Sequence, residues 1–135
     1  MTTTTPIPVA SLIDLSSQTV GLERETGNAV IIPPRQGGPP KRIPGYTVSV
    51  GYVTGDSPHA GELHPDADEL LYLMSGRVEV VLELEDGERH VEVNAGEAIV
   101  VPRGTWHLIL MKEPGHLLNI TPGPNGDHRP LPGAG

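Results

Sequence analysis

The chain has 135 residues, with 17 acidic and 9 basic side chains, a net charge of −8 and no cysteine. Its length fits one domain, the missing cysteines exclude disulfides, thiolate zinc sites and cysteine nucleophiles, and the acidic excess argues against nucleic acid as a partner. The 17 glycines and 15 prolines fit either many tight turns or partial disorder.

Residues 1–45 are interpreted as an N-terminal arm. Seven prolines interrupt this part, and the stretch from Pro33 to Gly45 excludes both a helix and a central strand. For the apolar pieces Val9–Leu15 and Ala29–Ile32, two alternatives are open: edge strands or extended parts of the arm. The start of the chain lacks the basic and apolar regions of a signal peptide, and no apolar run approaches the roughly 20 residues of a spanning helix. We therefore expect a cytoplasmic protein without membrane contact.

Residues 46–121 carry the regular pattern of the chain. Apolar residues alternate with polar ones in short segments, and glycine, proline or Asx turn signals separate the segments at spacings of roughly 8–12 residues. The expected strands are Tyr46–Thr54, Glu69–Met74, Val78–Leu84, a strand around Val91 and Val93, Ala98–Val101, Trp106–Met111 and Leu117–Ile120. No segment has a sustained helical period. The pattern predicts an all-β sandwich or barrel, followed by a Pro/Gly-rich tail at residues 122–135.

Two histidines and two carboxylates interrupt the apolar pattern of this barrel. Glu62 and His64 are two residues apart, so they share one face of a strand. Glu69 and His107 each lie among apolar residues on an inward face, where a polar group needs a partner or a metal. Histidine and carboxylate side chains that converge in a small barrel are typical of a metal site.

Two stretches of the sequence resemble the two motifs of the cupin family. The first follows Gly55 and has the form His64-x(4)-Glu69-x(6)-Gly76, and the second has the form Gly96-x(5)-Pro102-x-Gly104-x(2)-His107. The 19 residues between them, 77–95, fit the family's usual spacing. The resemblance covers residues 45–121 and implies a double-stranded β-helix, a jelly-roll-type barrel with a metal site in its mouth.

The sequence departs from these motifs at three positions. Glu62 stands where the first motif has a histidine, Gly55 is one residue out of register, and Met111 replaces the final asparagine of the second motif. The first departure changes the metal chemistry. Either Glu62 joins His64, Glu69 and His107 as a fourth ligand, or these three form a two-histidine, one-carboxylate triad and Glu62 acts as a general base or an anchor for a ligand.

Other ligand sets and a barrel without metal remain open. A third option recruits His59 instead of Glu62, and a barrel with no metal would leave all four residues in structural roles. The carboxylate ligands favour Fe²⁺ or Mn²⁺, while Zn²⁺ or Ni²⁺ are also compatible. For contact with a substrate, Tyr52 and Met111 are candidates because of their strands, and Arg103 because it could meet an anion.

The resemblance implies a metal-dependent enzyme that acts on a small organic molecule. We expect a dioxygenase first, because a two-histidine, one-carboxylate triad is available, and an isomerase or lyase using Glu62 second. The alternative is a cupin that binds or senses a small ligand without catalysis. The resemblance also implies a homodimer. Nucleic acid and membrane are not expected as partners.

Overall fold

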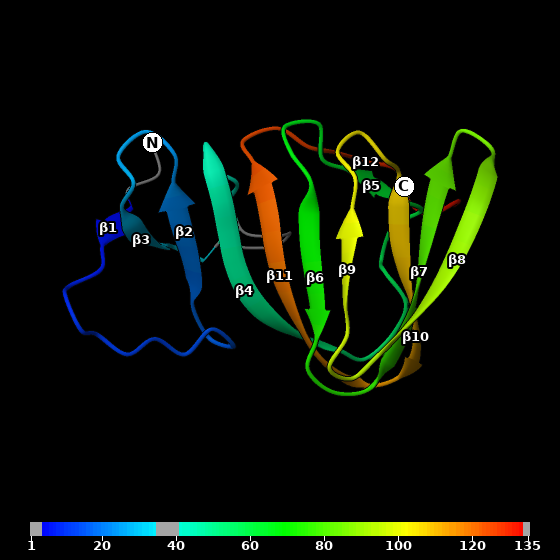
Figure 1. Ribbon diagram of the computed structural model, residues 1–135, viewed down its shortest axis with the longest axis horizontal. Coiled ribbons are helices and arrows are strands. Elements are labelled where there is room, and N and C mark those ends of the chain that lie inside the picture. Colours follow the sequence, from blue (N-terminus) through cyan, green and yellow to red (C-terminus); the bar gives the residue numbers. More distant parts are fainter. Residues whose placement is uncertain (1–3, 35–40, 134–135) are drawn as a thin grey trace.

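Residues 4–34 and 41–133 are described by a computed structural model, in which two antiparallel sheets pack against each other (Figure 1). The larger sheet contains, in spatial order, β1 (Thr5–Pro6), β3 (Ala29–Ile32), β2 (Thr19–Glu23), β4 (Gly45–Val53), β11 (Gly115–Gly123), β6 (Glu69–Leu73) and β9 (Ala98–Val101). The smaller sheet contains β12 (Asp127–His128), β5 (Glu62–Leu63), β10 (His107–Glu113), β7 (Arg77–Leu84) and β8 (Gly87–Asn94). The all-β prediction is confirmed.

Period-two alternation builds the core between the two sheets. In β6, residues 69, 71 and 73 are buried while residues 70 and 72 are exposed, because successive side chains of a strand point to opposite faces. The same alternation in β7 buries Val78 and Val80. One cluster forms the core and consists of Leu71, Leu73, Val78, Val80, Leu82, Val93, Val101 and Leu117.

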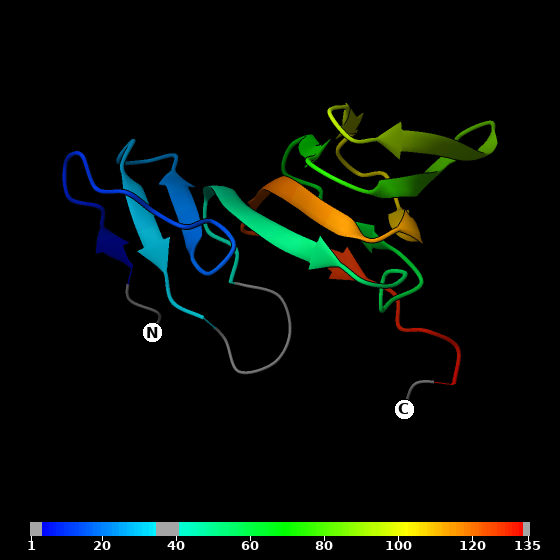
Figure 2. The same ribbon diagram turned by 90° about the horizontal axis from the view of Figure 1, so that it is seen from below.

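The N-terminal strands extend the larger sheet beyond the region that the smaller sheet covers (Figure 2). β2 pairs with β4 and β3 pairs with β2, and Val30, Ile32 and Ile43 form a second, small core there. The strand alternative for Ala29–Ile32 is confirmed as β3. Part of the predicted arm, residues 35–40, lies outside the described residues.

Of the two alternatives for Val9–Leu15, the edge strand is wrong, and the strand at Thr19–Glu23 was not expected. Turns occupy the first segment, since Pro8 and Asp14 accept hydrogen bonds from residues three or four positions later. Val9 and Leu12 are 98% and 99% exposed. β2 forms in spite of Gly21 because it pairs on both sides, and a Cβ at Gly21 would lie 2.6 Å from the Ile43 side chain.

The predicted tail is partly ordered as strand. β11 continues to Gly123, and β12 pairs with β5 through Asp127↔Leu63 and His128↔Glu62. Strands of the arm and of the tail thus pair with strands of residues 46–121. The division of the chain into arm, barrel and tail stays a prediction. Among the residues described, no helix is long and apolar enough to cross a bilayer.

Gly76 lies at the tight turn between β6 and β7, and its replacement tests how this end of the barrel closes. It has φ +84°, and a Cβ would lie 2.5 Å from the Pro114 carbonyl oxygen. Gly96 has a similar positive φ, +89°, but nothing lies within 4 Å of a Cβ built there. We expect Gly96→Ala to lower the free energy of unfolding by about 1–2 kcal/mol through backbone strain alone. Gly76→Ala should cost clearly more because the Pro114 backbone must also move, as urea denaturation can measure; equal losses would contradict this.

Candidate metal centre

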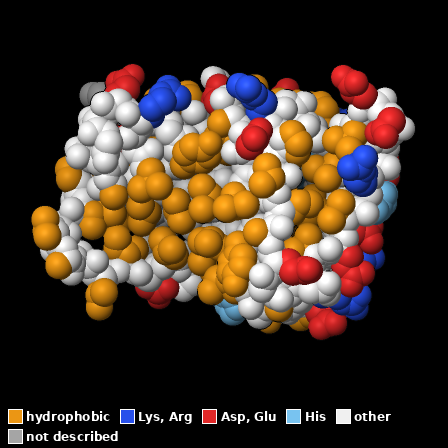
Figure 3. All heavy atoms as spheres, viewed as in Figure 1, with side chains coloured by type: hydrophobic (Ala, Val, Ile, Leu, Met, Phe, Trp, Pro, Cys, Tyr) orange, Lys and Arg blue, Asp and Glu red, His pale blue; other side chains and the backbone are white. Residues whose placement is uncertain are grey.

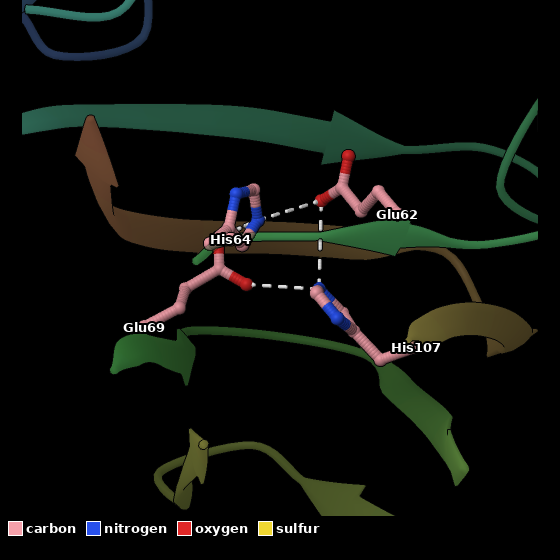
Figure 4. A group of neighbouring side chains, drawn as sticks. All are labelled: Glu62, His64, Glu69 and His107. Atoms are coloured by element: carbon pink, nitrogen blue, oxygen red, sulfur yellow. Dashed lines mark hydrogen bonds and ion pairs between the residues drawn. The ribbon is translucent and has the colours of Figure 1, made fainter. Parts of the chain in front are cut away.

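Four side chains from both sheets converge between the layers (Figure 4). Glu62 begins β5 and is paired in register with His107, the first residue of β10. His64 follows β5 directly, and Glu69 begins β6 in the other sheet. Each residue therefore stands at or next to the end of a strand, where the barrel opens. The ligand atoms that the four residues offer all lie within 4.8 Å of one another.

The distances describe a compact group of two imidazoles and two carboxylates. His107 Nε2 lies 3.1 Å from Glu69 Oε1 and 3.5 Å from Glu62 Oε1. His64 Nε2 lies 3.3 Å from Glu62 Oε1 and 3.5 Å from Glu69 Oε2. The side chains of His64, Glu69 and His107 are 7%, 4% and 2% exposed, whereas that of Glu62 is 31% exposed. Glu62 is thus the member of the group that faces outward.

The group fits a divalent cation. His107 Nε2 and Glu69 Oε1 are 3.1 Å apart, and both atoms are buried without a hydrogen bond of good geometry among the described residues. Buried polar atoms without partners are costly and call for an explanation, of which an ion is one. Two neutral imidazoles and two carboxylates supply nitrogen and oxygen ligands and neutralise two positive charges.

Neighbouring residues fix how two of the four side chains point. His107 Nδ1 lies 3.0 Å from the Thr105 carbonyl oxygen, so Nδ1 carries the hydrogen that it donates there. When the ring is neutral, as it must be to bind a metal, the lone pair of Nε2 is therefore directed at the group. The Thr121 hydroxyl donates to Glu69 Oε2 at 2.7 Å. The Gly104 amide donates to the His64 carbonyl oxygen at 2.8 Å and ties the two motif segments together.

Without a metal, the four groups shift one another's pKa values. Burial alone would lower the pKa values of both histidines, but the close, negatively charged carboxylates of Glu62 and Glu69 raise that of His64 to about 9 and that of His107 to about 10. Burial alone would raise the pKa of both carboxyls, but the histidines lower that of Glu69 to about 2 and that of Glu62 further. Two imidazolium–carboxylate pairs thus hold the metal-free site together.

A cavity of about 670 Å³ opens beside the group. Its lining residues are Lys41, Arg42, Pro58, His59, Glu62, His64, Pro124, Gly126, Asp127 and His128. His59 is not part of the converging group; its Nε2 lies 3.6 Å from Glu62 Oε2, and its Nδ1 accepts a hydrogen bond from the Gly61 amide at 3.1 Å. Burial lowers the pKa of His59 although the charge of Glu62 opposes this, so its ring is neutral at pH 7.

The three residues suggested for substrate contact lie away from this cavity. Tyr52 is 58% exposed on β4, and its ring packs against that of His116 at a centroid distance of 4.8 Å. Arg103 is exposed, and its backbone amide donates to Asp68. Met111 is in β10, where its amide donates to Asp56. Their contact with a substrate stays a prediction that the cavity does not support.

The sequence reasoning missed the lining residues Arg42, Lys41 and His128. Arg42 and Lys41 lie in the Pro-rich segment just before β4, and His128 lies in the segment interpreted as a tail. No periodicity marks these positions. A basic pair next to the first strand of the barrel is a weak signal that could have identified Arg42.

Comparisons with known proteins agree with the motif resemblance. The family model described as Cupin domain matches residues 48–121. A cupin-2 domain protein from Shewanella frigidimarina is 26% identical in structure-based comparison, with a TM-score of 0.50, and the match covers 66% of this chain and 84% of that one. The double-stranded β-helix, a jelly-roll-type barrel, is thereby confirmed as the fold class. A search of curated protein sequences found no match.

Two enzyme structures also match. An oxalate decarboxylase variant from B. subtilis is 22% identical with a TM-score of 0.53, and the match covers 64% of this chain and 24% of that one. Hydroquinone 1,2-dioxygenase in complex with Cd²⁺ and 4-hydroxybenzonitrile is 22% identical with a TM-score of 0.49, with 58% of each chain covered. This chain thus covers little more than half of the dioxygenase chain and a quarter of the decarboxylase chain. The decarboxylase match supports the fold alone, and no argument rests on the dioxygenase match.

The shifted pKa values predict the pH dependence of the metal-free protein. The folded pKa values of His64 and His107 exceed the unfolded value of 6.5, so their stabilisation is complete below pH 6.5 and is lost as pH rises through about 9 to 10. The carboxyls are shifted downward, so their stabilisation is complete above pH 4.5 and is lost as pH falls toward about 2. We expect the melting temperature of chelator-treated protein to be highest between these limits.

A matched variant separates this site from the rest of the chain. His90 pairs with Glu79 and Glu88 on the surface, so His90→Gln should leave the alkaline decline in melting temperature nearly unchanged. His107→Gln should reduce the alkaline decline in melting temperature, because it removes one of the two titrating imidazoles of the site. An alkaline decline that persists fully in His107→Gln would show that other groups cause it.

Proposed function

Because this chain belongs to the cupin domain family, we propose that it is a metal-dependent enzyme that acts on a small organic molecule. The single observation that carries the proposal is the convergence of Glu62, His64, Glu69 and His107 at the wall of a cavity large enough for a small organic ligand. We assign the metal to Fe²⁺ or Mn²⁺, since half of the donors are carboxylates, with Zn²⁺ or Ni²⁺ as further candidates.

In this proposal His64, Glu69 and His107 are the permanent ligands. All three side chains are at most 7% exposed, and two of them are oriented by fixed partners, Thr105 for His107 and Thr121 for Glu69. Two imidazoles and one carboxylate leave coordination positions open toward the cavity. A divalent ion held there would polarise a substrate oxygen and orient the substrate.

Glu62 is proposed as the proton-transfer residue. It lines the cavity, it is more exposed than the three ligands, and its Oε2 faces His59. With His64 and His107 bound to a metal as neutral rings, the divalent ion beside Glu62 favours its carboxylate form at neutral pH, and a carboxylate can accept a proton from a bound substrate. Neutral His59 is placed to receive or return that proton through Glu62.

Two reaction classes follow from this arrangement, and they are distinguished by their need for oxygen. The two-histidine, one-carboxylate triad favours a dioxygenase. Proton transfer by Glu62 favours an isomerase or a lyase. Oxygen uptake with candidate catechols or diketones supports the dioxygenase, whereas turnover under nitrogen supports the second class. A non-catalytic, ligand-binding cupin would bind metal and ligand without turnover in either condition.

Metal content separates the ligands from Glu62. Untagged protein reconstituted with Fe²⁺ or Mn²⁺ without oxygen should hold one ion per chain, as elemental analysis can measure. His64→Ala and His107→Ala should lose it, because each removes one of three permanent ligands. Glu62→Gln should retain the ion but lower any turnover by about 100-fold or more. The surface control Glu85→Gln should retain both the ion and the turnover.

Two results would change this assignment. If Glu62→Gln loses the ion as completely as His107→Ala does, Glu62 is a ligand. Wild-type protein that takes up none of Fe²⁺, Mn²⁺, Zn²⁺ or Ni²⁺ would falsify the proposed function.

We also propose that the protein is a homodimer formed through the outer face of the larger sheet. The register pairs align two rows of outward-facing apolar residues across four adjacent strands. The first row is Val48, Ile120, Leu70 and Val100, and the second is Val50, Leu118, Tyr72 and Ala98. Figure 3 shows apolar side chains gathered over the middle of this face, with charged groups mostly at its edges.

A second copy of the chain is the occupant that suits this face. Contiguous apolar patches of more than a few hundred Å² are rare on monomers. A twofold axis brings a patch against itself, and two rows without a charged residue meet without like-charge repulsion. The outer face of the smaller sheet is different: β7 and β8 present Glu79, Glu83, Glu88 and Glu92 there.

Light scattering at micromolar concentration tests the dimer. We expect twice the chain mass for wild type and the mass of one chain for Tyr72→Glu, since a charge in the centre of the patch must be buried without a partner. Leu131→Glu, which adds the same charge at a residue that is 45% exposed beyond β12, should remain dimeric. A monomeric wild type would remove the proposal.

A further inference from the structure

We infer that Arg42, assisted by Lys41, forms an oxyanion subsite in the cavity, and that the substrate is a small organic carboxylate. This inference rests on the proposed function, because it assigns the substrate class of the same site. Arg42 and Lys41 line the cavity together with Glu62 and His64, so one ligand can reach both the basic pair and the metal-binding group.

The Arg42 side chain is held in place by a single partner. It lies just before β4 and is partly buried, and its Nη1 donates to the Thr47 hydroxyl at 2.9 Å. Thr47 is 2% exposed, so this anchor is fixed. Within residues 4–34 and 41–133 this is the one hydrogen bond of the Arg42 side chain, so its other N–H donors are available to a ligand in the cavity that Arg42 lines. A planar guanidinium with free donors matches a carboxylate in bidentate fashion.

The charges of the cavity favour an anion once the metal is bound. The two negative charges of Glu62 and Glu69 balance a divalent ion. The other charged residues of the lining are then the cations Arg42 and Lys41 and the anion Asp127, an excess of one positive charge. Neither Arg42 nor Lys41 forms a salt bridge among the described residues, whereas Arg77 pairs with Glu92 and Arg129 with Glu83. In a chain of net charge −8, a wall with excess positive charge indicates a site for a negative ligand.

The size and surface of the cavity favour an organic anion over an inorganic one. A volume of about 670 Å³ is in the range of sites for small organic ligands. Pro58, Pro124 and Gly126 add apolar surface to the lining. In this proposal the carboxylate pairs with Arg42, and the rest of the molecule extends toward Glu62 and His64, which line the same cavity.

Calorimetric titration of the Mn²⁺-loaded protein with pyruvate tests the subsite, with pyruvamide as the uncharged counterpart. We expect wild type to bind pyruvate, and to bind pyruvamide at least about tenfold more weakly. The amide has no negative charge with which Arg42 can form an ion pair. Arg42→Gln should weaken pyruvate binding about tenfold or more. Arg42→Lys should retain part of it, since a lysine keeps the charge but loses the bidentate geometry. Arg89→Gln, at an exposed position of β8, should bind like wild type.

Metal content and circular dichroism of every variant separate failure of this inference from failure of the proposed function. If no metal binds but pyruvate still binds in an Arg42-dependent way, the subsite holds and the proposed function does not. The subsite is overturned by any of three results in folded, metal-loaded protein: equal binding of pyruvate and pyruvamide, unchanged binding by Arg42→Gln, or no pyruvate binding by wild type at millimolar concentration. If Arg42→Gln does not fold, Arg42→Lys and Lys41→Gln carry the comparison, and wild-type affinity in both overturns the inference.

Discussion

The balance between two carboxylates, buried Glu69 and half-buried Glu62, and two buried imidazoles is the constraint on which the centre of this barrel depends. Isolated charges between the sheets would be strongly unfavourable, and paired ones are tolerated when their remaining lone pairs and protons are satisfied. Glu69 comes from the larger sheet, and Glu62 and His107 come from the smaller one. The group therefore ties the sheets together electrostatically at the open end of the barrel, where the apolar core does not reach. Removing one member leaves the others with an unbalanced buried charge.

The supports of this group extend into the N-terminal part of the chain. Glu69 accepts a hydrogen bond from Thr121, the Thr47 hydroxyl lies 3.4 Å from the Thr121 carbonyl oxygen, and Arg42 donates to Thr47. A continuous chain of polar contacts thus runs from the buried carboxylate across β11 and β4 to the wall of the cavity. The segment before β4 belongs to the site physically, because a shift of β4 would move Arg42 and Thr121 together.

Local patterns predicted much of the fold and the composition of the centre. Period-two alternation identified the central strands, and the spacing of the two motifs predicted that Glu62, His64, Glu69 and His107 meet. The alternation also explains why Tyr52 is not in the cavity: it has the parity of Val48 and Val50, which face outward. β2 and β12 could not be predicted, because partners far away in the sequence stabilise them rather than their own composition.

The same dependence on distant partners governs the cavity. The wall that carries His128 is a two-residue strand, too short to be stable by itself. It is held by contacts of the next residue: the Arg129 amide donates to the Gly61 carbonyl oxygen at 2.8 Å, and the Ala60 amide donates to the Arg129 carbonyl oxygen at 2.8 Å. The Arg129 guanidinium stacks over the Trp106 ring at 4.1 Å and pairs with Glu83.

Trp106 immediately precedes His107, so a single aromatic residue connects the C-terminal wall of the cavity to a member of the central group. The motif segments thus supply the converging side chains, and the flanking segments supply the surface that a ligand meets. Two chains with the same motifs and different flanks would keep the central chemistry while differing in what they bind. In this protein the selectivity of the site is therefore expected to follow Arg42 and the C-terminal strand more closely than the motifs themselves.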